Sequence, residues 1–242
     1  MKKIIALALL AGAVVAANAQ NFTEGWENGP ATFNDTTGLT FGNSGPTNMA
    51  FGSGTWVAFN NSANAATAPT GWFNNETIWA PHGGTQQLTA NFNNTTGTNT
   101  IDNYMMSMVR TFNNGDTIKF WTRAPFSGAG AFPDRLIVKL SKSGASTAVA
   151  DFNTTLLTIN PTLTNTGYPA IYTEFTATVS GLSGATSGRF AFNYNVTNGG
   201  PGGANSDLIT IDDVAYTQAV PEPATMAALG LGVAALLRRR RK

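Results

Sequence analysis

The sequence predicts an all-β fold, either a sandwich or a barrel of antiparallel strands. Strand-forming Thr, Val, Ile and Phe dominate the interior of the chain, and clusters of Gly, Asn and Pro interrupt them at short intervals. Residues 117–123 alternate Ile118, Phe120 and Thr122 with bulkier polar or amphipathic side chains, as a strand with one buried face does. No interior stretch repeats its apolar residues with the period of a helix.

Four strands are expected in the first half of the body. Each holds aromatic or apolar side chains and is followed by residues that favour turns, such as the segment Pro81-His82-Gly83-Gly84. The expected strands are residues 56–59, which read Trp-Val-Ala-Phe, the alternating residues 87–92, the apolar run 104–109, and residues 117–123, which follow the turn at Gly115 and Asp116.

The second half of the body continues the pattern. The expected strands are residues 135–141, with the clearest pattern in the chain, residues 148–152, the alternating residues 171–179 and 189–196, and residues 208–216. Asp134 lies before the first of these, and we expect it to join Arg123 and Arg135 in a surface or half-buried salt-bridge network. The loop at residues 197–207 is so rich in Gly and Asn that we expect it to be mobile or shaped for a ligand.

Composition describes an acidic, charge-poor body between two basic ends. Charged residues are 11% of the 242, against about 25% in an average soluble protein. Residues 20–219 hold 7 basic and 12 acidic residues, a net charge of −5, because the two termini hold the other basic ones. This balance argues against a nucleic-acid partner. The chain has no Cys, so its fold rests on an apolar core without disulfides.

The N-terminal residues have the pattern of a secretory signal peptide. Lys2 and Lys3 precede an apolar run from Ile4 to Ala17, and Ala17-Asn18-Ala19 is a small-x-small cleavage site. We therefore expect residues 1–19 to be removed after export by the Sec machinery, and residues 20–217 to form a single domain.

The C-terminal residues, 218–242, resemble the PEP-CTERM sorting signal of Gram-negative bacteria. Its three parts are all present in order: Pro221, Glu222 and Pro223, then an uncharged stretch from Ala224 to Leu237, then the cations Arg238, Arg239, Arg240, Arg241 and Lys242. The apolar helix would span about 21 Å, short of the roughly 30 Å hydrocarbon core of a bilayer. The resemblance implies a transmembrane-like helix that anchors the protein briefly in the inner membrane, and an exosortase as the processing partner. A plain tail anchor is the alternative.

The body is similar to the choice-of-anchor J domain. The similarity lies in four motifs in order: Gly71-Trp72-Phe73, residues 114–123, Pro133-Asp134-Arg135-Leu136, and Ile211-Asp212-Asp213-Val214. That family is similar to cleaved-adhesin domains, so the resemblance implies a jelly-roll, concanavalin-like β-sandwich. It also implies a bacterial surface or matrix module and leaves the molecular activity open.

No catalytic residues are indicated. The one histidine, His82, lies in a predicted turn, and no neighbouring residues form a nucleophile elbow. A glycosidase needs two carboxylates roughly 5–10 Å apart across a cleft. Asp212 and Asp213 are adjacent, so on a regular strand they point to opposite faces and do not form that pair. We therefore expect a protein that is not an enzyme, with a polysaccharide-active hydrolase as the alternative.

Calcium is the metal that the sequence could accommodate. It takes carboxylate and carbonyl oxygens and needs neither Cys nor His. Related sandwich domains place an acid of the first strand beside an acid of the last, which by analogy joins Glu27 (or Glu24) to Asp212 or Asp213. The alternative is that Asp213 makes ordinary hydrogen bonds or lies near an arginine.

Tryptophans offer a second kind of site. An exposed indole could stack on the apolar face of a sugar, although tryptophans of a sandwich this size are more often buried. We expect Trp56 and Trp121 in the core, and Trp72 and Trp79 as the exceptions because they flank polar loops. The function expected is an exported, non-catalytic surface or extracellular-matrix protein, adhesive or structural and associated with exopolysaccharide. A carbohydrate-binding module is the further alternative.

Overall fold

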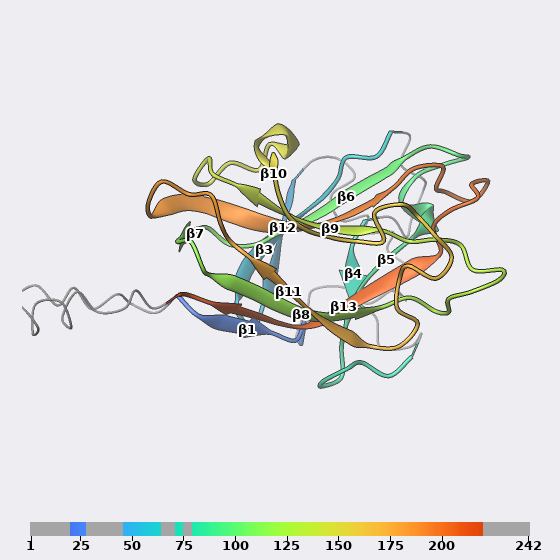
Figure 1. The fold of residues 1–242 in the computed structure, drawn as a ribbon, viewed down its shortest axis with the longest axis horizontal. Coiled ribbons are helices and arrows are strands. Elements are labelled where there is room, and N and C mark those ends of the chain that lie inside the picture. Colours follow the sequence, from blue (N-terminus) through green and yellow to red (C-terminus); the bar gives the residue numbers. More distant parts are fainter. Residues whose placement is uncertain (1–19, 28–45, 64–70, 75–78, 220–242) are drawn as a thin grey trace, which may run out of the picture.

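The computed structural model describes residues 20–27, 46–63, 71–74 and 79–219, and these form a sandwich of two antiparallel sheets, as the sequence predicts (Figure 1). The predicted signal peptide and most of the sorting segment lie outside the described residues. In the described part, no helix is long and apolar enough to cross a membrane.

The first sheet has the strand order β11-β8-β13-β5-β4, with β1 paired to β13. Its strands are β1 (Phe22–Glu24), β4 (Phe73–Asn74), β5 (Leu88–Asn91), β8 (Thr117–Arg123), β11 (Thr173–Thr178) and β13 (Leu208–Thr217).

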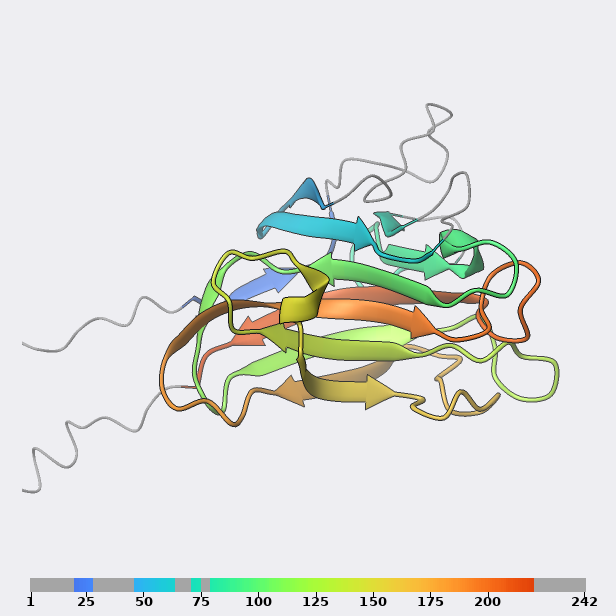
Figure 2. The ribbon, with the colours of Figure 1, turned by 90° about the horizontal axis from the view of Figure 1, so that it is seen from above.

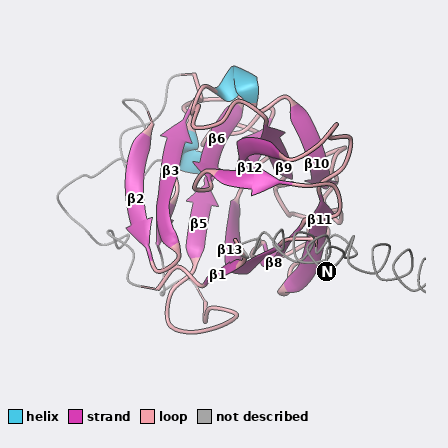
Figure 3. Ribbon diagram, turned by 90° about the vertical axis from the view of Figure 1, so that its left-hand side faces the viewer, coloured by secondary structure: helices cyan, strands magenta, loops and turns pink. Residues whose placement is uncertain are grey.

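The second sheet has the order β10-β9-β12-β6-β3-β2, with β7 paired to β12. Its strands are β2 (Thr47–Phe51), β3 (Gly54–Asn60), β6 (Ile101–Met106), β7 (Arg110–Phe112), β9 (Leu136–Ser141), β10 (Thr154–Ile159) and β12 (Thr186–Val196). The chain crosses repeatedly from one sheet to the other, as in a jelly roll: β1, β4–β5, β8, β11 and β13 belong to the first sheet, and the strands between them belong to the second. Seen from one end, the two sheets face each other across the core (Figure 3).

Aromatic side chains fill the space between the sheets. Trp56 on β3 has no exposed surface and lies against Trp26, Phe190 and Phe192, with ring centroids 4.9, 5.6 and 6.4 Å away. The alternation on β8 buries Ile118, Phe120 and Thr122, as its sequence predicts. Burial of this much apolar surface is the main stabilising contribution in a chain without disulfides.

Two expectations about β9 and its neighbours are wrong. Residues 148–152 do not form a strand, because Val149–Asp151 close a 3₁₀ turn in which Phe152 N donates to the Val149 carbonyl. Asp134 forms no salt bridge with Arg123 or Arg135. It is buried, and the Arg135 guanidinium donates to the Asn195 backbone and side-chain oxygens at 2.7 and 2.5 Å.

Both ends of the domain lie at the same end of the sandwich, at the left of Figure 1. There β1 pairs with β13, so that Phe22 is opposite Tyr216. Gln20 N donates to Gln218 Oε1 at 3.1 Å, and Gln218 N donates to Asn21 Oδ1 at 2.8 Å. The segments before and after the domain are therefore attached side by side.

Candidate functional site

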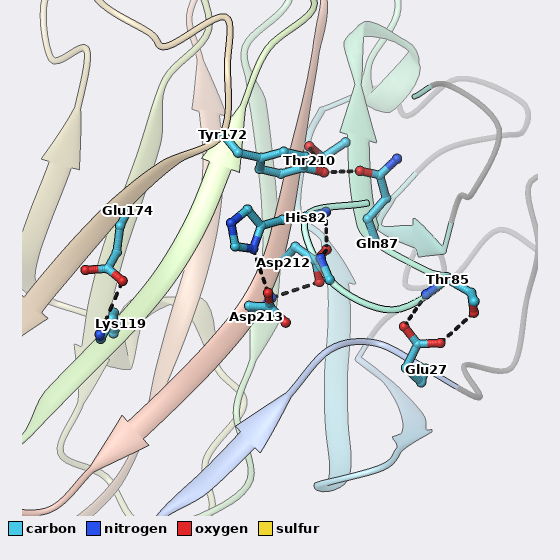
Figure 4. A network of polar contacts seen from close by, with 11 residues as sticks. Glu27, His82, Thr85, Gln87, Lys119, Tyr172, Glu174, Thr210, Asp212 and Asp213 are labelled. Carbon is cyan, nitrogen blue, oxygen red and sulfur yellow. Dashed lines mark hydrogen bonds and ion pairs between the residues drawn. The ribbon is translucent and has the colours of Figure 1, made fainter. Parts of the chain in front are cut away.

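A bulge in β13 brings the two adjacent aspartates, Asp212 and Asp213, to the same loop. The pairing of β13 with β8 shifts register between Asp212 and Ala215, and Asp213 has a left-handed φ of 45°. Both carboxylates therefore reach residues 79–87, which cross the outer face of the first sheet (Figure 4). The expectation that they point to opposite faces is wrong, because it assumed a regular strand.

Asp212 holds this loop through its backbone. One carboxylate oxygen accepts hydrogen bonds from His82 N at 2.8 Å and Gly83 N at 3.1 Å, and the other accepts from Asp213 N at 2.8 Å. Burial raises the pKa of Asp212 to about 7, although the three N–H groups act in the opposite direction. Asp213 contacts the loop through its side chain, since its Oδ2 lies 2.6 Å from His82 Nδ1.

Glu27 holds the far end of the same loop. Its carboxylate accepts from Thr85 N at 2.8 Å, Thr85 Oγ1 at 2.7 Å and Gln86 N at 3.2 Å. Burial acts to raise the pKa of Glu27, but the hydrogen bonds from Thr85 and Gln86 outweigh it and leave that pKa below its ordinary value. The carboxylates predicted as metal ligands thus clamp the loop at residues 79–87.

The described residues around Glu27, Asp212 and Asp213 do not assemble a set of calcium ligands. N–H and O–H donors occupy the oxygens of Glu27 and Asp212, where a cation would need free lone pairs. Over the described ranges, no group of three or more His, Cys, Asp or Glu side chains could hold a metal ion. Calcium binding through Glu27, Asp212 and Asp213 stays a prediction without a described ligand set.

Two of the tryptophans, Trp72 and Trp121, do not lie where the sequence predicts. Trp72 has no exposed surface and packs in the core against Tyr194, with ring centroids 6.4 Å apart, so it is unavailable for sugar stacking. Trp79 is half-buried on the outer face, where the Arg123 guanidinium lies 4.4 Å from its ring centroid. Trp121, expected in the core, is half-buried on the outer face of β8, and the His82 ring stacks on it at 3.9 Å. Cationic or imidazole groups thus already cover one face of Trp79 and of Trp121.

The contact between His82 and Asp213 resembles part of a catalytic triad but lacks a nucleophile among the described residues. None of the described Ser or Thr hydroxyls hydrogen-bonds to the His82 ring, which instead packs between Trp121 and Tyr172. Tyr172 donates to Gln87 Oε1, and the Gln87 amide donates to the Trp79 carbonyl at 2.9 Å. Sequence reasoning missed Tyr172 and Gln87. Gln87 lies in the loop itself, but only the folded sheet brings Tyr172, in the segment before β11, to it.

We expect Gly84→Ala to destabilise the domain by about 2 kcal/mol or more. Gly84 has a φ of +59°, and an added Cβ would collide with Glu27 Oε1, so the carboxylate must leave Thr85 and Gln86. Urea denaturation followed by circular dichroism measures the loss. Gly184→Ala is the matched control, because a Cβ there meets nothing within 4 Å. Equal stabilities of the two variants would contradict the clamp.

Comparison with known proteins identifies the end of the chain. Residues 219–242 match a family model described as the PEP-CTERM protein-sorting motif. This agrees with the resemblance drawn from Pro221, Glu222, Pro223 and the terminal arginines. No curated protein matches the chain.

Several solved structures resemble the body. The K1 cleaved adhesin domain of Lys-gingipain from Porphyromonas gingivalis W83 is 17% identical, covers 83% of this chain and 99% of its own, and gives a TM-score of 0.49. The K3 cleaved adhesin domain of the same protein is 16% identical, with 82% and 98% covered and a TM-score of 0.47.

A more distant likeness is to the C-terminal CBM6 of LamC, a marine laminarinase from Zobellia galactanivorans. It is 12% identical, covers 82% of this chain and 99% of its own, and gives a TM-score of 0.35. The fold assignment rests on the strand pairing of the chain itself, and these likenesses add no argument about function.

Proposed function

We propose that this chain is an exported, non-catalytic surface or extracellular-matrix protein that an exosortase trims at the C-terminus. The match of residues 219–242 to the PEP-CTERM sorting motif carries this proposal. Its Pro221-Glu222-Pro223 segment suits a protease, because the two prolines disfavour helix and keep the chain extended. The terminal arginines resist translocation and stay on the cytoplasmic side.

The fold suits a protein whose two ends are both removed. Because Gln20 and Gln218 are hydrogen-bonded to each other at one end of the sandwich, a signal peptide and a sorting segment leave from the same place. Neither cut would touch the core between the sheets. We assign the body to the choice-of-anchor J domains on the four sequence motifs given above, as part of this proposal.

The role we propose outside the cell is adhesive or structural and associated with exopolysaccharide. Charged residues are 11% of the chain, so Asn, Thr, Ser and Gly supply most polar groups of the body. Hydroxyl and amide groups form hydrogen bonds with sugar hydroxyls.

Intact mass and localisation of the protein in its native host test the proposal. We expect the wild-type protein outside the cell, without residues up to about Ala19 and from about Pro221 onward. Replacing Pro221 and Pro223 together with alanine should keep the protein in the membrane fraction at full C-terminal mass. Pro161→Ala, at an exposed position of the body, is the control and should be released normally. Persistence of the C-terminus in the released wild-type protein would overturn the proposal.

A further inference from the structure

A cavity opens at the end of the sandwich opposite to the two termini. The loop between β8 and β9, the loop between β12 and β13 and the 3₁₀ turn η1 (Phe92–Asn94) meet there, at the right of Figures 1 and 2. The cavity has a volume of about 160 Å³ and is lined by Phe92, Phe132, Gly200, Gly203 and Asp207, among others. Phe132 is 49% exposed, a large apolar surface beside a cavity.

The backbone of Asp207 is fixed on both sides. Its N–H donates to Asp134 Oδ1 at 3.0 Å, and its carbonyl accepts from Phe92 N at 2.9 Å. Within the part of the chain that the structure describes, no hydrogen bond or ion pair engages the half-buried Asp207 carboxylate. Burial raises the pKa of Asp207. Asp207 thus lines the cavity, and its carboxylate has no described hydrogen-bond donor.

The loop between β12 and β13 is held in a tight, strained shape. Ser206 has a left-handed φ of 68°, its N–H donates to the Pro133 carbonyl at 2.9 Å, and its Oγ accepts from Gly200 N at 3.2 Å. A Cβ on Gly203 would collide with the carbonyls of Asn198 and Gly199. Such strain is typical of pre-organised ligand sites, where it removes the ordering that binding would otherwise require.

The lining selects for a neutral ligand with both an apolar face and hydroxyl groups. The Phe92 and Phe132 rings offer apolar surface, and the Asp207 carboxylate accepts hydrogen bonds from hydroxyls. No Lys, Arg or His lines the cavity, so an anionic ligand would meet Asp207 without a counter-charge. The volume is below the 300–1,000 Å³ usual for drug-sized ligands, which leaves room for about one ring.

We propose that this cavity binds one neutral pyranose unit of an extracellular polysaccharide. This inference rests on the proposed association with exopolysaccharide. It adds the place where the polysaccharide binds and the requirement that the bound sugar is uncharged. β13 runs from the cavity at Leu208 to Thr217 beside the sorting segment. Its 10 residues span about 30 Å. While the tail is anchored, the cavity therefore faces away from the point of attachment.

The test measures binding to the full chain, purified in a detergent without a sugar headgroup. Saturation-transfer NMR with glucose, galactose, mannose and glucuronate measures binding of single sugars. Co-sedimentation with host exopolysaccharide measures binding of the polymer. We expect millimolar binding of at least one neutral hexose and none of glucuronate at neutral pH. Phe132→Ala should weaken hexose binding roughly tenfold or more, and Asp207→Asn should reduce the discrimination against glucuronate.

Phe126→Ala is the matched control, because Phe126 is also 49% exposed, lies on the same loop and does not line the cavity. It should bind as the wild-type protein does. If Phe132→Ala retains full binding to host polysaccharide, the cavity is not the site, although the proposed function stands. If the wild-type protein is released from the cell but binds neither hexoses nor the polysaccharide, both the site and the polysaccharide association are overturned.

Discussion

Replacing Trp56 with alanine is expected to destabilise the domain by about 3–5 kcal/mol. Trp56 is fully buried between the sheets, where its ring meets Trp26, Phe190 and Phe192. Its loss leaves a cavity that rigid strands on both sides cannot close. The indole Nε1 also donates to Ser53 Oγ at 3.2 Å, and that hydroxyl donates to the buried Glu24 at 2.5 Å. The substitution therefore also disturbs a polar network that links β1 to the turn between β2 and β3.

Urea denaturation followed by far-ultraviolet circular dichroism measures this loss without relying on tryptophan fluorescence. Phe126→Ala is the control: it also truncates an aromatic side chain, but one that is 49% exposed, and we expect a change below about 1 kcal/mol. A Trp56→Ala variant within about 1 kcal/mol of the wild type would show that the core repacks, and would contradict the rigid sandwich described here.

The sequence predicted strands where side-chain alternation is strict. β8 has the predicted bounds, Thr117–Arg123, because Ile118, Phe120 and Thr122 alternate strictly with larger side chains and are the three positions that the fold buries. β2 and β10 were not predicted, because Thr and Asn occupy positions that only the neighbouring strands make part of a sheet. The strand predicted at residues 148–152 is wrong because a short apolar run suits a 3₁₀ turn as well as a strand.

The candidate site could be predicted only in part. Acids from both ends of the domain were expected to meet, and Glu27 and Asp213 do clamp one loop. Their partners are N–H groups and the His82 ring. The contact between Asp213 and His82 depends on the bulge in β13, which no local sequence pattern indicates. Trp72 was misplaced because a polar neighbourhood in sequence says little about what the opposite sheet covers. The cavity at the end opposite to the termini is lined by residues from three separate loops. The sequence alone indicated only one of them, the Gly-rich loop at residues 197–207.

Raising the pH from 5 to 9 is expected to destabilise the domain, and Asp134 is the main reason. Asp134 is buried between Tyr168 and Tyr194, and burial raises its pKa from 3.8 to about 8. Hydrogen bonds from Tyr194 Oη at 2.6 Å and Asp207 N at 3.0 Å act in the opposite direction, and the nearby Asp207 carboxylate raises the pKa further. The folded state therefore holds a proton between about pH 4 and pH 8 that the unfolded chain has released.

Stability consequently falls as pH rises through this window. Three pH units at about 1.4 kcal/mol each give an upper bound of about 4 kcal/mol between pH 5 and pH 8. Asp212, with a pKa raised to about 7, adds a change of the same sign. The lowered pKa of Glu27 acts in the opposite direction, but its stabilisation is lost at acidic pH, mostly below this window.

Asp134→Asn should remove most of the pH dependence, because an amide oxygen can still accept from Tyr194 and Asp207 but carries no charge. We expect the variant to be close to the wild type at pH 5 and more stable than it at pH 9, by urea denaturation at each pH. Asp151→Asn makes the same substitution at a half-buried position and should follow the wild-type curve. If Asp134→Asn loses stability with pH as steeply as the wild type, Asp134 is ionised throughout this pH range. Asp212, whose carboxylate accepts three backbone hydrogen bonds, would then be the next candidate for the titrating group.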